Sequence, residues 1–310
     1  MPSNESAYQA VARPLKAPAT TTATQPSGSG LGYMIQAAFW FAVMALIVKL
    51  AGAQGLPTMQ IVFARALVTL ALSAIALRRA RIRPFGNNTR LLLLRGLYGS
   101  GGLMCFYAAL NHLPLAEATV LHQISPVLTA VVAAIWIGEK LEMRVLIGMA
   151  LAFSGVVMIA QPASLLTAST SEAQIAWPFV LVGVCGALLA SLAYVAVRRL
   201  GQTEPPQLVV FYFPIVTVPI SLPFAVHDWV WPSAYGWALL IGVGVATQIA
   251  QIALTNGLMR EPAGRAISVG YLQVAFATIF GLVIFGTMPG LWSWLGMAMI
   301  IGSVFIARRR

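Results

Sequence analysis

Three polar side chains lie close together in the stretch TVLHQISPVL, residues 119–128, whose flanking residues are mainly apolar. They are the imidazole of His122, the amide of Gln123 and the hydroxyl of Ser125. Such groups can hold a small polar molecule by hydrogen bonds, and an imidazole also changes charge near neutral pH. Pro126 has no N–H, so we expect it to leave the carbonyl of His122 without its helical partner. Side chains and backbone together favour the wall of a cavity here; a histidine satisfied by packing is the alternative.

The composition decides what surrounds these residues. Of the 310 residues, 59% are hydrophobic and 9% are charged, whereas soluble domains carry about 25% charged residues. Apolar runs of about 20 residues, the length that crosses a bilayer as a helix, recur along the chain. We therefore predict an all-α polytopic membrane protein. Polar groups at membrane depth are tolerated beside a cavity or another polar group, which supports the interpretation of the His122 stretch.

Ten transmembrane helices, with both termini cytoplasmic, are expected from the apolar runs and the distribution of basic residues. The ranges are 31–50, 57–77, 91–112, 114–138, 144–161, 177–197, 207–225, 234–258, 262–286 and 291–307. Lys and Arg gather at every second connection, and the connections after the third, fifth, seventh and ninth helices hold none. Positive residues stay on the cytoplasmic side, which places both termini there. Lys49 and Arg65 are the two exceptions to this pattern.

A shift of 148 residues aligns the fourth helix with the ninth. The identical pairs are Pro114 and Pro262, Ala118 and Ala266, Gly138 and Gly286, and, beyond these helices, Gly148 and Gly296. A unit of five helices crosses the membrane an odd number of times, so the second unit enters from the opposite side. Inverted repeats are typical of membrane transporters, whose substrate lies near the midplane where the repeats meet.

The expected organisation is a disordered cytoplasmic tail at 1–30, a first five-helix repeat at 31–162, an extracytoplasmic linker at 163–176 and a second repeat at 177–310. Within the second repeat, the stretch SVGYLQV (268–274) corresponds to the His122 stretch. Gly270 can distort the helix there, as Pro126 does in the first repeat, while Tyr271 and Gln273 offer polar groups. We therefore expect the two stretches to lie opposite each other across the pseudo-symmetry axis.

Arg65 is the charged residue predicted to lie deepest in the membrane. It follows Pro57 by eight residues, which puts it roughly 12 Å below the outer surface at 1.5 Å per residue. A charge at this depth normally faces the bundle interior or a wet cavity. We predict that Arg65 attracts or orients an anionic group of a substrate and that Lys49 reinforces its field. A structural role for Arg65, and a Lys49 ammonium that reaches the interface, remain the alternatives.

Two acidic residues are assigned to a gate or charge network. Glu117 lies at the outer end of the fourth helix, where it either stabilises the helix N-terminus or pairs with Lys49 or Arg65 as a gate. Glu139 lies at the inner end of the same helix. We expect it to form a network with Lys140 or with the arginine-rich connection between the second and third helices.

Further polar and aromatic residues are placed around the candidate cavity without knowledge of which way they face. Each can equally make a helix–helix hydrogen bond or a lipid contact. They are Trp40, Tyr107, Asn111, Tyr194, Gln248, Gln251 and Asn256.

Two stretches of the first repeat carry a resemblance to a known family. They are RGLYGSGGLMCFYAALNHLPLAEATVLHQISPVLTAVVAAIWIGEKL (95–141) and GMALAFSGVVMIAQP (148–162), preceded by Trp40, Lys49 and Arg65 at fitting positions. The chain resembles the EamA-type repeat of the drug/metabolite transporter superfamily over roughly residues 31–309. The resemblance is weaker in the second repeat, where Thr287 replaces the acidic residue found at Glu139. It implies a ten-helix carrier of small metabolites, often an exporter, that works by alternating access.

We therefore expect a secondary carrier for a small anionic or zwitterionic metabolite, such as an amino acid or a related compound, with export favoured. Its expected partners are this substrate and membrane lipids, in a monomer or homodimer within a bacterial inner membrane. No cofactor or metal is expected. The energy source stays open, because titration of His122, exchange and facilitated diffusion are all compatible with the sequence.

Other classes of function are less favoured. The basic residues form short clusters between apolar runs, which disfavours nucleic-acid binding. No phosphate-binding loop motif is present, which disfavours ATP-driven pumping. An intramembrane enzyme would have to work with one aspartate and three histidines. A pore or a non-transporting membrane scaffold remains the main alternative.

Overall fold

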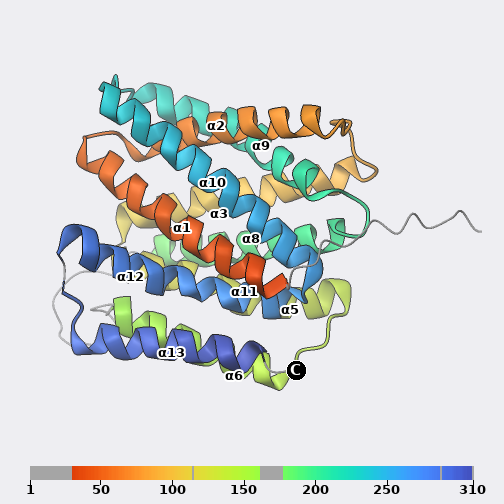
Figure 1. The fold of residues 1–310 in the computed structure, drawn as a ribbon, viewed down its shortest axis with the longest axis vertical. Helices are drawn as coiled ribbons and strands as arrows, with labels where there is room; N and C mark the ends of the chain where they lie inside the picture. The colour runs from red at the N-terminus through yellow and green to blue at the C-terminus, as the bar shows by residue number, and fades with distance from the viewer. Residues whose placement is uncertain (1–29, 114, 161–176, 287, 309–310) are drawn as a thin grey trace, which may run out of the picture.

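The computed structural model describes residues 30–113, 115–160, 177–286 and 288–308, and over these ranges the chain is entirely helical (Figure 1). The expected tail, up to residue 29, and the linker at 163–176 lie outside the described residues. The first repeat contains α1 (Gly30–Ala53), α2 (Thr58–Arg79), α3 (Thr89–His112), α4 (Leu115–His122), α5 (Ser125–Ile137) and α6 (Met143–Ala160). The second contains α8 (Trp177–Leu200), α9 (Pro206–His227), α10 (Ala234–Arg260), α11 (Ala263–Ser268), η1 (Val269–Tyr271), α12 (Leu272–Phe285) and α13 (Leu291–Arg308).

The predicted polytopic architecture is confirmed. Within the described residues, nine helical segments are long and apolar enough to cross a membrane, and a shorter apolar helix at Leu291–Ile306 occupies the tenth expected position. The fourth span, Ala118–Ile137, joins α4 and α5, and the ninth, Ala263–Phe285, joins α11, η1 and α12. Both were expected as single helices, and both are interrupted. That the termini face the cytoplasm stays a prediction.

Each helix of one repeat packs against a helix of the other repeat (Figure 1). The pairings are reciprocal: where a helix of the first repeat contacts one of the second, their repeat equivalents contact each other as well. α1 packs on α10, and the equivalent exchange pairs α8 with α3. α5 packs on α8, as α12 packs on α1. The pair α2 and α9 lies at one edge of the bundle, and the pair α6 and α13 lies at the opposite edge. This exchange of partners is what two inverted five-helix repeats require.

Glycine lets two of these helix pairs approach closely. A Cβ atom on Gly155 of α6 would lie 2.6 Å from the carbonyl oxygen of Gly296 on α13. In α3, a Cβ on Gly102 would lie 3.0 Å from the carbonyl oxygen of Gly186 on α8. Small residues are the usual means by which membrane helices pack, because lipid gives no hydrophobic drive for association.

Candidate functional site

The fourth and ninth spans are interrupted at equivalent places. α4 ends at His122 and α5 begins at Ser125, with Pro126 in its first turn, where the missing N–H removes no helical bond. In the second repeat, α11 ends at Ser268, and a single 3-10 turn that contains Gly270 separates it from α12. Backbone that departs from the α-helix at membrane depth is tolerated where it is buried in protein or lines a cavity.

One hydrogen bond joins the two interruptions. The hydroxyl of Tyr271 donates to the carbonyl oxygen of Gln123 at 2.9 Å, between residues separated by 148 positions, which is the repeat shift itself. Tyr271 is fully buried. The sequence placed the freed carbonyl at His122, whereas the carbonyl that gains a partner across the repeats is that of Gln123. The reason is that the chain makes a turn after His122 instead of continuing as one helix.

A cavity opens between the two interruptions and α1, with an empty volume of about 480 Å³, its open side included. Residues from both repeats line it: Met34, Ala37, Ala38 and Phe41 of α1; His122, Gln123, Ser125 and Pro126 of the first interruption; Tyr194 of α8; Leu254 of α10; and Ile267, Gly270 and Gln273 of the second interruption. The cavity therefore brings together His122, Gln123, Ser125, Pro126, Gly270 and Gln273 from the sequence prediction.

The cavity wall combines apolar surface with a few polar groups. Met34 and Phe41 supply apolar area, while His122, Gln123 and Gln273 supply donors and acceptors. The imidazole of His122 is half-buried and packs against the ring of Phe106, with centroids 4.6 Å apart. None of the described residues that line the cavity carries a permanent charge. Such a wall can orient a small polar molecule by hydrogen bonds against an apolar support.

Several residues predicted to contact a ligand are not among those that line this cavity: Tyr271, whose hydroxyl binds the Gln123 carbonyl, and Arg65, Gln248, Trp40 and Tyr107. Arg65 is buried in α2, and its Nη1 lies 3.6 Å from the Sδ of Met44. Gln248 of α10 exchanges hydrogen bonds of 2.9 and 3.1 Å with Ser73 of α2, so it makes a helix–helix contact. Trp40 and Tyr107 pack edge-on or tilted against a neighbouring phenylalanine in their own helices.

The outer charge network is described in part. The Lys49 ammonium lies 4.0 Å from the centre of the Phe285 ring, at the ends of α1 and α12. Such a cation–π contact stabilises an exposed cation modestly. The side chain of Glu117 lies outside the described residues, so its pairing with Lys49 or Arg65 stays a prediction.

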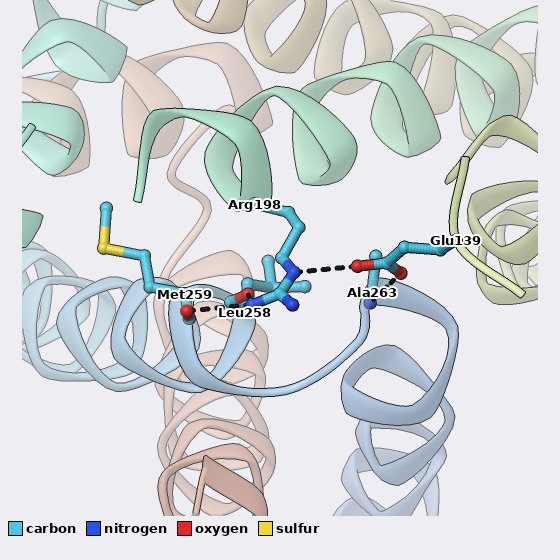
Figure 2. Close-up of polar contacts among 5 residues, drawn as sticks. All are labelled: Glu139, Arg198, Leu258, Met259 and Ala263. Atoms are coloured by element: carbon cyan, nitrogen blue, oxygen red, sulfur yellow. Dashed lines mark hydrogen bonds and ion pairs between the residues drawn. The ribbon is translucent and has the colours of Figure 1, made fainter. Parts of the chain in front are cut away.

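At the opposite end of the bundle, Glu139 forms an ion pair that joins the two repeats (Figure 2). Its Oε1 lies 2.8 Å from Nε of Arg198, the third-last residue of α8. Its Oε2 accepts a hydrogen bond of 2.7 Å from the backbone N–H of Ala263, where α11 begins. The partner is therefore Arg198, and not Lys140 or the arginine-rich connection that the sequence suggested, because Gly138 ends α5 in the left-handed conformation (φ 69°) and turns the chain at this point.

Arg198 completes this contact by binding the end of α10. Its Nη1 donates to the carbonyl oxygens of Met259 at 2.9 Å and Leu258 at 3.4 Å, as Figure 2 shows. The carboxylate thus lies at a helix N-terminus and the guanidinium at a helix C-terminus, the arrangement that helix dipoles favour. We call Glu139, Arg198 and these backbone groups the inner latch, because the sequence predicts that this end of the bundle faces the cytoplasm. It holds α5, α8 and the α10–α11 connection together.

Sequence reasoning missed two arginines. Arg198 and Arg95 were both counted among the cytoplasmic basic residues, yet Arg198 forms the inner latch and Arg95 is 4% exposed within α3. The signal for Arg95 is its sequence context, since it follows four consecutive leucines.

The geometry just described agrees with the comparisons with known proteins. Residues 28–161 and 177–309 each match the EamA-like transporter family. The chain belongs to that family. Among its relatives, the pseudopaline exporter CntI of Pseudomonas aeruginosa is 29% identical over 274 residues, which cover 88% of this chain and 93% of the exporter. A probable transport protein of Saccharomyces cerevisiae is 31% identical over 68% of this chain and 65% of its own length.

Solute carrier family 35 member G1 of Mus musculus is 28% identical over 89% of this EamA-like chain and 77% of its own length. A protein solved by crystallography has the same fold, with a TM-score of 0.79 and 19% identity over 90% of this chain and 96% of that one. The chain is therefore a membrane transporter, a multi-pass integral protein of the inner membrane.

Proposed function

We propose that this EamA-like protein is a secondary carrier that exports a small anionic or zwitterionic metabolite, an amino acid or a related compound, by alternating access. The observation that carries the proposal is the cavity at the interruptions of the fourth and ninth spans. Both repeats contribute to its wall, which combines an apolar surface with a few polar groups. The export direction draws support from the relative named as a pseudopaline exporter.

The polar groups of the wall favour a ligand that carries both polar and apolar parts. His122, Gln123 and Gln273 offer hydrogen bonds from both repeats, and Met34 and Phe41 offer an apolar surface on the α1 side. An amino acid presents ammonium and carboxylate groups at one end and a variable side chain at the other. A wall of this kind can bind the polar end firmly while it accepts different side chains.

The asymmetry between the two ends of the bundle supports alternating access. The inner latch combines an ion pair with hydrogen bonds to three backbone groups. At the outer end, Lys49 lies over the ring of Phe285, and the position equivalent to Glu139 is Thr287. A carrier must break the contacts at one end and form those at the other in turn, and these are contacts between the repeats.

The test is counterflow in liposomes that contain the purified protein. Labelled amino acids are offered outside, with the unlabelled compound inside, in the presence and absence of a pH gradient. We expect saturable uptake that unlabelled substrate on the opposite side accelerates. Acceleration by the pH gradient would assign proton coupling, and its absence would assign exchange or facilitated diffusion. Ionic conductance in planar bilayers without saturable flux would instead identify a pore and refute the proposal.

A further inference from the structure

Arg95 is a buried cation near the inner end of α3. It lies six residues after the helix begins at Thr89, and 4% of its surface is exposed. A basic residue that only follows the positive-inside pattern would extend its guanidinium into water or toward lipid headgroups. The contacts of Arg95 instead come from α9 and α10, inside the bundle.

The contacts of Arg95 leave its charge uncompensated. Its Nη2 donates one hydrogen bond of 3.1 Å to Oε1 of Gln251, and its guanidinium lies 4.8 Å from the centre of the Phe213 ring. Within the described part of the chain, Nε and Nη1 are buried without a hydrogen-bond partner, and no acidic side chain pairs with this arginine. Arg198 of the inner latch, by contrast, has a carboxylate and two carbonyl oxygens as partners.

Arg95 interacts with one residue of the cavity wall. Tyr194, which lines the cavity, is close enough to Arg95 to interact with it electrostatically. Gln251 lies three residues before Leu254 on α10. Leu254 also lines the cavity. The guanidinium and the cavity therefore share Tyr194 as a neighbour.

A buried charge is costly unless it is paired, and removal of its partner leaves a strongly unfavourable site. The described residues provide no acidic partner for Arg95, so an anionic ligand is a candidate for that place. A planar guanidinium with free N–H groups matches a carboxylate, which accepts two parallel hydrogen bonds.

We propose that Arg95 is the subsite for the carboxylate of the transported metabolite, with Gln251 as the residue that positions its guanidinium. The proposal rests on the function proposed above and names the residue that selects for an anion. It also replaces Arg65 in this role. Neither α2, which carries Arg65, nor α3, which carries Arg95, contributes a residue to the cavity lining. Arg95 differs from Arg65 in its neighbour Tyr194, which does line the cavity.

The first experiment compares Arg95→Met with Arg90→Met, a matched change at an exposed residue in the first turn of the same helix. Arg95→Met removes a charged hydrogen-bond partner of the substrate. It should therefore lower the transport efficiency, the maximal counterflow rate divided by the half-saturating substrate concentration, roughly 10- to 100-fold. The same variant should melt at a higher temperature than the wild type in detergent, because it removes an unpaired buried charge. Arg90→Met should change neither. A lower melting temperature for Arg95→Met would assign Arg95 a structural role and overturn the proposal.

The second experiment identifies the group that Arg95 binds. Free L-amino acids and their primary carboxamides, which lack the negative charge, are compared in counterflow and in thermal-shift measurements. The free acids should be exchanged and should stabilise the wild type, and they should fail to stabilise Arg95→Met. Arg95→Lys, which keeps the charge without the planar fork, should recover part of the exchange.

The outcomes separate this proposal from the proposed function. Equal exchange of acids and carboxamides by the wild type would overturn the carboxylate subsite while the carrier function stands. Undiminished exchange of the acids by Arg95→Met would do the same. A wild type that exchanges neither set would refute the proposed substrate class, and the subsite with it.

Discussion

Substitution of Glu139 by glutamine should open the inner end of the bundle. The Glu139 carboxylate uses one oxygen for Arg198 Nε at 2.8 Å and the other for the Ala263 N–H at 2.7 Å. A glutamine amide has one acceptor oxygen, so it can keep one of these two bonds and turns an NH₂ group toward the other donor. The substitution therefore removes one charge-assisted hydrogen bond, which is worth about 1.5–3 kcal/mol.

This energy translates into a change of population. If the inner latch exists only while the inner end is closed, the ratio of open to closed molecules should rise roughly 10- to 150-fold, at 1.4 kcal/mol per factor of ten. Arg198→Gln should act similarly, because it removes the same ion pair. In the double variant, the change in the free energy of opening should be smaller than the sum of the changes in the two single variants, since both substitutions break one shared contact.

Distance measurements between spin labels can detect this opening. Lys140 follows α5 and Gln202 follows α8, and both are exposed, so cysteines there can carry labels once Cys105 and Cys185 are replaced. Glu139→Gln should add a population at longer distance. The control is Glu142→Gln, which changes the same charge at an exposed residue outside the latch. A distance distribution identical to that of the wild type would refute the role of the latch.

Three further predictions concern the cavity and the helix contacts. Tyr271→Phe should lower the free energy of unfolding by about 1–3 kcal/mol, because the buried Gln123 carbonyl loses its 2.9 Å partner; an unchanged melting temperature in detergent would contradict this. His122→Gln should keep transport, because a glutamine amide can still hydrogen-bond in the cavity wall, but it should remove any pH dependence that comes from this imidazole; liposome flux with the wild-type pH profile would exclude His122 as a proton site. Gly155→Leu should destabilise the protein by about 1–3 kcal/mol or more, since its Cβ would lie 2.6 Å from the Gly296 carbonyl oxygen; unfolding at the wild-type temperature would show that α6 and α13 can separate at no cost.

Much of the fold could be predicted because the membrane restricts the choices. Apolar runs of helical length mark the spans, and the 148-residue shift relates the repeats. Gly138 and Gly286, matched by this shift, both end their helices in the left-handed conformation, with φ of 69° and 64°. The breaks after His122 and Ser268 were harder to place, because a proline or a glycine weakens a helix without dictating how the chain continues.

The candidate site could be predicted in part, since depth follows from sequence but helical facing does not. The residues around His122 and Gly270 line the cavity because the polar groups and the distortion occur at the same position of each repeat. Arg65 and Gln248 lie in spans of suitable depth, but Arg65 contacts Met44 and Gln248 contacts Ser73. Which face a side chain occupies depends on helix rotation, and packing sets that rotation.

Arg95 shows a different limit of sequence reasoning. The positive-inside pattern explained its presence, so its burial was not anticipated. A charge distribution orients the chain in the membrane, but it does not show which of the basic residues reach water. The packing of α3 against α9, and the contact with Gln251 of α10, show an arginine that has no acidic partner among the described residues.

The central claim, that the substrate occupies the cavity between the interrupted spans, is tested most directly by filling the cavity. Ala38 of α1 is 2% exposed and lines it, whereas Ile35, three residues earlier on the same helix, is 40% exposed on the outer surface of the bundle. The measurement is counterflow of labelled amino acids by Ala38→Trp and Ile35→Trp, each checked for folding by its melting temperature. We predict that Ala38→Trp abolishes the exchange while Ile35→Trp retains it. Wild-type exchange by a folded Ala38→Trp would contradict the account.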